Sequence, residues 1–172
     1  MWRRLLCTFV ITFLITNSVI ASDYVLPYPS YMPGHKLYTI SKLFDLLKQY
    51  WYWGTIASIK YHTNISDKYL VEAKTLFEYK QYLLALQALD RSNDHFLKIS
   101  PLLGLANKER KEIKEIVNSY HGEIFAQSKL LEELKQITPL EYLWTPEKKK
   151  STQLFIRENL NAAIKLRVYL SE

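Results

Sequence analysis

The chain has 172 residues, of which 48% are hydrophobic and 23% are charged, and this balance favours one packed domain over a disordered chain. It contains only 4 glycines and a single cysteine, which argues against glycine-rich phosphate-binding loops and excludes an intramolecular disulfide. The formal net charge of +6 is basic but modest. With no groove-reading motif beside it, this charge argues against nucleic-acid recognition.

The first residues have the organisation of an export signal. Arg3 and Arg4 precede an apolar run over residues 5–15, and small or modest side chains lead to Ala21, after which we expect cleavage. Processing would remove two of the 23 basic residues and none of the 17 acids, which lowers the net charge to +4. It would also remove Cys7. The alternative is that residues 1–21 stay in place as an N-terminal anchor.

Residues 22–38 form a segment rich in proline and tyrosine. Pro27, Pro29 and Pro33 disfavour helix in the residues before them, so the sequence predicts an extended strap that ends in a turn at Pro33–Gly34. We consider two interpretations. The strap closes over one end of the core, or its tyrosines, Tyr28 and Tyr31 among them, form an exposed strip that recognises a partner or a glycan.

Residues 39–172 are predicted to form an all-α domain, an antiparallel bundle of about five helices, because apolar residues recur at helical spacing and no stretch alternates like a β-strand. We expect helices over residues 39–61, from a cap at Ser66, from Tyr82 to Ser100–Pro101, over residues 106–137, and from Thr145–Pro146 onwards. The helix over 106–137 has the spacing of a coiled-coil seam. Its seam residues are Ile113, Val117, Tyr120, Ile124, Gln127, Leu131 and Leu134, and those of the last helix are Ile156, Leu160, Ile164 and Val168.

The strap and the start of the helical region carry a family resemblance. Residues 26–29 read LPYP, residues 32–38 read MPGHKLY, and residues 42–45 read KLFD. Over about residues 23–96 this resembles the exported bacterial family known as domain of unknown function 5667. Ser30, Gly34 and Lys36 differ from the pattern of that family. The resemblance implies an extracytoplasmic helical protein and brings no catalytic residues with it.

The residues suited to catalysis or metal binding do not form a recognisable site. The four histidines are far apart in the sequence, and only Asp90, Asp94 and His95 lie close together. A metal centre needs several converging ligands, so we expect no metal and no cofactor. No nucleophile motif is present, and the single cysteine lies in the signal. We therefore do not expect an enzyme.

Two clusters remain as candidates for an interaction surface. Trp51, Tyr52 and Trp53 cannot all face one core, because successive helical residues point about 100° apart. They are read as edges of the core partly covered by the strap, as a partner-binding patch, or as a membrane contact. Residues 148–150 are three lysines, expected in the first turn of the last helix. They are read as a solvated face or as a contact to anionic lipids or wall polymers.

These observations predict an exported helical protein of the cell envelope that acts through contacts with an envelope protein. The alternatives are a module that binds a glycan or a lipid, and an enzyme with an unrecognised site. The candidate interaction surface consists of Tyr28, Tyr31, Trp51, Tyr52, Trp53, Lys148, Lys149 and Lys150.

Overall fold

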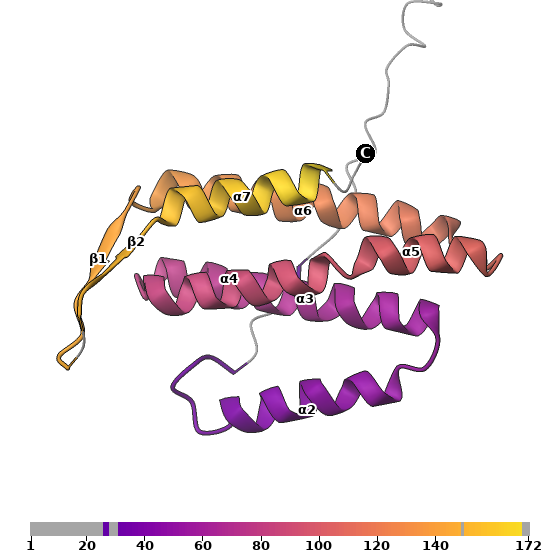
Figure 1. Ribbon diagram of the computed structural model, residues 1–172, viewed down its shortest axis with the longest axis horizontal. Coiled ribbons are helices and arrows are strands. Elements are labelled where there is room, and N and C mark those ends of the chain that lie inside the picture. The colour runs from indigo at the N-terminus through magenta and orange to yellow at the C-terminus, as the bar shows by residue number, and fades with distance from the viewer. Residues whose placement is uncertain (1–25, 28–30, 149, 170–172) are drawn as a thin grey trace, which may run out of the picture.

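The computed structural model describes residues 26–27, 31–148 and 150–169, and in them it confirms an all-α fold (Figure 1). Six helices and one short hairpin are present in this part of the chain. In chain order they are α2 (Tyr38–Trp51), α3 (Thr55–Glu78), α4 (Tyr82–Phe96), α5 (Ile99–Lys108), α6 (Lys114–Ile137), β1 (Tyr142–Trp144), β2 (Thr152–Leu154) and α7 (Ile156–Tyr169).

The helices lie in three layers (Figure 1). α3 and α4 form an antiparallel pair at the centre, α6 and α7 cover one side of it, and α2 lies alone on the other side, along α3. The main core lies where α3, α4, α6 and α7 meet. Small side chains allow α3 and α4 to approach closely, since Ala73, Ala85 and Ala88 are completely buried.

The helices expected at the start of the domain are divided differently. The helix expected over residues 39–61 is interrupted, because residues 52–53 are not helical and Gly54 has a φ of 91°, which favours glycine. Ser66 is not a cap, since α3 continues through it and its buried hydroxyl donates to the carbonyl of Ser92 at 3.0 Å. The expectation for Ser66 followed the local pattern and missed this contact with α4.

Two further boundaries were wrong. Ser100–Pro101 does not stop a helix but lies in the first turn of α5, where a missing N–H has no helical partner to lose. The helix expected over 106–137 is broken after Lys108, and Arg110 there has a φ of 55°. From residue 114 the expected seam is confirmed, with Tyr120, Ile124, Gln127, Leu131 and Leu134 buried.

The segment after α6 forms a hairpin and not the start of a helix at Thr145–Pro146. β1 and β2 pair antiparallel, with Leu143 opposite Gln153. Strands of three residues are too short to show an alternation in the sequence. The hairpin is held on the core by the Tyr142 ring, which lies 4.8 Å from that of Tyr82, and by the buried Leu154. In α7 the buried positions are Ile156, Leu160, Ala163 and Arg167, whereas Val168 is exposed.

Candidate functional site

The orientation of α2 about its own axis is the reverse of that of an ordinary surface helix. Its polar side packs against α3 and its apolar side faces outward: Leu43 is 57% exposed and Trp51 is 76% exposed. Amphipathic helices of globular proteins normally bury the apolar side. We call the outward side the α2 apolar face, and it consists of Ile40, Leu43, Phe44, Leu46, Leu47, Tyr50, Trp51 and, just beyond the helix, Trp53.

Polar contacts hold the inward side of α2. Asp45 is only 6% exposed, and its carboxylate pairs with Lys68 of α3 and lies 3.8 Å from Lys48. Lys68 also donates to Ser41 at 3.1 Å, and the Tyr61 hydroxyl donates to the Asp45 carbonyl at 2.9 Å. These contacts account for the burial of a carboxylate at a helix interface, where an unpaired charge would be costly.

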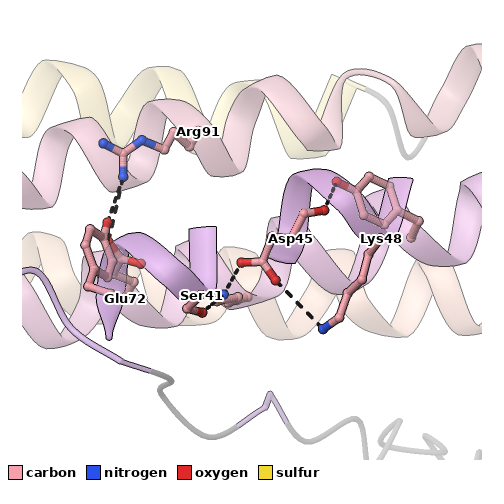
Figure 2. Close-up of polar contacts among 8 residues, drawn as sticks. Ser41, Asp45, Lys48, Glu72 and Arg91 are labelled. Atoms are coloured by element: carbon pink, nitrogen blue, oxygen red, sulfur yellow. Dashed lines mark hydrogen bonds and ion pairs between the residues drawn. The ribbon is translucent and has the colours of Figure 1, made fainter. Parts of the chain in front are cut away.

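A second group of polar side chains anchors the first turn of α2. The Tyr38 hydroxyl donates to Glu72 of α3 at 2.6 Å and accepts from Arg91 of α4 at 3.0 Å. Burial raises the pKa of Glu72 above its usual value, and the hydrogen bond from Tyr38 and the charge of Arg91 oppose this rise. Figure 2 shows the two groups, Asp45 with Ser41 and Lys48, and Glu72 with Arg91.

The aromatic residues at the end of α2 divide between the two sides. Tyr52 is half-buried and its ring lies 5.5 Å from that of Tyr61. Trp53 is 86% exposed, and its indole N–H donates to the Tyr50 carbonyl. Leu47, Tyr50, Trp51 and Trp53 line a shallow apolar hollow of about 480 Å³. The interpretation in which the strap covers a tryptophan of this cluster is therefore wrong for the described residues of the strap, since Trp51 and Trp53 are both exposed.

The other predicted surface residues do not join this face. Tyr31 is exposed and stacks on His35 at 5.0 Å, whereas Leu26 and Met32 of the strap pack against the main core. Lys148 and Lys150 are exposed between β1 and β2, which corrects their expected place in a helical first turn. Tyr28 and Lys149 lie outside the described residues.

Sequence reasoning missed a buried network at the centre of the bundle. Arg167 of α7 is completely buried and donates to Gln127 of α6 at 2.7 Å, to Asn93 of α4 at 2.8 Å and to Ser92 at 3.1 Å. Gln127 in turn donates to Asp67 of α3 at 2.5 Å. Burial lowers the pKa of Arg167 to about 10. The only signal in the sequence was a glutamine in the seam of the long helix.

Glu123 lies beside this network, at the edge of a cleft of about 320 Å³ between α3 and α6. Burial, and secondly the charge of Asp67, raise the pKa of Glu123 to about 8. The carboxyl is therefore mostly protonated at neutral pH. Tyr120, which lines the same cleft, has a buried hydroxyl with no hydrogen-bond partner among the described residues. These groups and the Arg167 network bring several polar side chains together inside the bundle.

Two histidines from different helices also meet. The Nδ1 atoms of His62 in α3 and His95 in α4 lie 2.9 Å apart. Burial lowers the pKa of both, and that of His95 falls to about 4 because burial and, secondly, the neighbouring His62 and Lys98 disfavour its charged form. Within the described residues, no three histidine, cysteine, aspartate or glutamate side chains are placed to hold a metal ion.

The histidine pair predicts an acid-sensitive stability. Above the usual histidine pKa of 6.5 both rings are neutral in both states, but as the pH falls from 6.5 towards 4 the unfolded chain binds a proton that folded His95 does not. His95 is half-buried, so after allowing for solvent screening we expect a loss of about 1–2 kcal/mol. Urea unfolding of His95→Gln should show a smaller loss between pH 7 and pH 4.5 than the wild type. The exposed His121→Gln should keep the wild-type slope, and equal slopes for the His95 variant would contradict the prediction.

Comparison with known proteins gives no relative. No family model, no curated protein and no solved structure matches the chain. Among the helices of the described residues, none is both long enough and apolar enough to span a bilayer.

Proposed function

We propose that this protein is an exported, non-catalytic component of the cell envelope that acts by docking, with the α2 apolar face as its docking surface. The observation that carries the proposal is the inverted packing of α2. Because the polar side of α2 makes the contacts with α3, eight large apolar residues lie in water. Contiguous exposed apolar surface of this kind marks interaction sites. The signal-like residues 1–21 and the family resemblance support export.

The polar groups near α2 support docking over catalysis. Asp45 forms an ion pair with Lys68. Glu72 accepts a hydrogen bond from Tyr38 and forms an ion pair with Arg91. A catalytic acid or base must reach a substrate atom, whereas these carboxylates lie between helices and contact other side chains. Their arrangement accounts for the orientation of α2 and so for the exposure of its apolar face.

The proposal can be tested by protection of an introduced cysteine, because the natural Cys7 lies in the predicted signal and is removable as Cys7→Ser. In that background, Leu43→Cys on the α2 apolar face and Phe125→Cys on α6 are treated with a membrane-impermeant maleimide. Both positions are well exposed, at 57% and 65%, so neither substitution disturbs the core. Intact mass of the recovered protein also shows whether it begins at Ser22.

In isolated envelopes we expect Leu43→Cys to be protected and Phe125→Cys to react. After solubilisation and purification both should react. Equal reaction of the two positions in envelopes would show that nothing occupies the α2 apolar face and would overturn the docking proposal. A chain that stays inside the cell would overturn export.

A further inference from the structure

We infer that the α2 apolar face docks on the surface of a lipid bilayer, with α2 lying in the plane of the interface. This inference rests on the proposed function and adds the identity of the partner. Three features of the described residues favour lipid: the shape of the surface, the placement of its polar atoms and the sign of the charge at its border.

The shape is that of one protruding helix. α2 lies along the lower edge of the molecule in Figure 1, with α3 on its inner side, and its 14 residues extend about 21 Å along one line. Exposed apolar side chains recur at helical spacing along this line, from Ile40 to Trp51. Interfacial helices lie in this way, with the apolar side inserted to the depth of the headgroups and upper acyl chains.

Few polar atoms lie on the face. Of the eight residues of the α2 apolar face, only Tyr50, Trp51 and Trp53 carry a polar side-chain atom, and the indole N–H of Trp53 already donates to a carbonyl. Protein–protein interfaces usually contain a hydrogen bond for every 100–200 Å² or so. Hydrocarbon needs none. The three rings gather at one end of α2, and tyrosine and tryptophan favour the headgroup level of a membrane.

The charge at the border of the face is positive. Between residues 31 and 53 the only acid is Asp45, which is buried and paired, whereas the three bases are Lys36, Lys42 and Lys48. Lys36 and Lys48 are exposed. Anionic lipid headgroups attract lysines in this position, beside an inserted apolar face. Charge and apolar surface therefore favour the same partner.

The test uses the purified protein in the form in which it is exported, in a Trp144→Phe background, so that Trp51 and Trp53 report on the face. Trp144 is half-buried in the hairpin and would otherwise add a constant signal. The protein is mixed with vesicles of phosphatidylcholine, with or without phosphatidylglycerol, and binding is measured by flotation. A blue shift of tryptophan emission and protection from acrylamide should accompany binding.

We expect binding to vesicles that contain phosphatidylglycerol, weaker binding to phosphatidylcholine alone, and release by salt. Leu43→Gln/Leu47→Gln should weaken binding by at least about tenfold, because two leucines no longer insert. Lys48→Gln should weaken it about two- to fivefold and only on the anionic vesicles. The matched control Phe125→Gln, which removes an exposed apolar ring from α6, should bind like the wild type.

The outcomes separate this inference from the proposed function. No vesicle binding, with Leu43→Cys still protected in envelopes, would overturn lipid as the partner and leave a protein or a wall polymer in its place. A dimer that the Leu43→Gln/Leu47→Gln variant converts to a monomer would identify a second copy as the partner and would also overturn the inference. No vesicle binding and no protection would overturn both proposals.

Discussion

Replacing Arg167 by methionine is expected to lower the free energy of unfolding by about 3–5 kcal/mol at pH 7. Methionine fills much of the space but donates no hydrogen bond, so Gln127, Asn93 and Ser92 would lose the donors that the guanidinium supplies. Buried polar groups without partners are the reason for a loss of this size. Urea unfolding followed by circular dichroism measures it, and a domain of ordinary stability would be left only marginally folded.

The control for this prediction is Lys165→Met, which changes an exposed position on the same helix. It should alter the free energy of unfolding by no more than about 0.5 kcal/mol. Arg167→Lys should fall between the two, because lysine keeps the charge but lacks the planar group that bonds to α4 and α6 at once. Wild-type stability in Arg167→Met would mean that the network does not hold α7 on the bundle.

Replacing Glu123 by glutamine is expected to stabilise the protein at alkaline pH. The unfolded carboxyl ionises near its usual pKa of 4.5, whereas the folded carboxyl does so only near 8. Below pH 4.5 both states hold the proton and nothing is lost, but as the pH rises towards 8 the unfolded state gains from ionising and folding becomes less favourable. Glutamine does not titrate, so the variant escapes this loss.

We expect Glu123→Gln to gain about 2–4 kcal/mol over the wild type at pH 8, and less than about 1 kcal/mol at pH 5. Unfolding curves at the two pH values measure the difference. The exposed Glu133→Gln on the same helix is the control and should show no such dependence. An advantage for Glu123→Gln that is the same at both pH values would point to packing and not to a shifted pKa.

The parts of the fold that depend on neighbouring residues could be predicted. The start of α4 at Tyr82, the seam of α6 after residue 114 and the end of α6 before Pro139 all follow from helical spacing and from proline. The breaks after α2 and α5 were missed. Each contains a residue at positive φ, Gly54 or Arg110, and an arginine gives no hint of that conformation.

The orientation of α2 could not be predicted from its own sequence. Leu43, Leu47 and Tyr50 recur at helical spacing and lie on one side of the helix, but which side faces α3 depends on what α3 presents. There Lys68 and Glu72, one turn apart, offer partners to the polar side of α2. The contacts of Arg167 span 40 to 75 residues, and local spacing does not contain that information.

The inverted packing of α2 also has a calorimetric consequence. The heat capacity change of unfolding comes from apolar surface that moves into water, and polar surface contributes with the opposite sign. The apolar face of α2 is already in water, so unfolding exposes no further apolar surface from this face and the face adds little to the heat capacity change. Covering the same face with an apolar partner would lower the heat capacity clearly. The apolar face of α2 should therefore contribute to the heat capacity change of complex formation and not to that of unfolding.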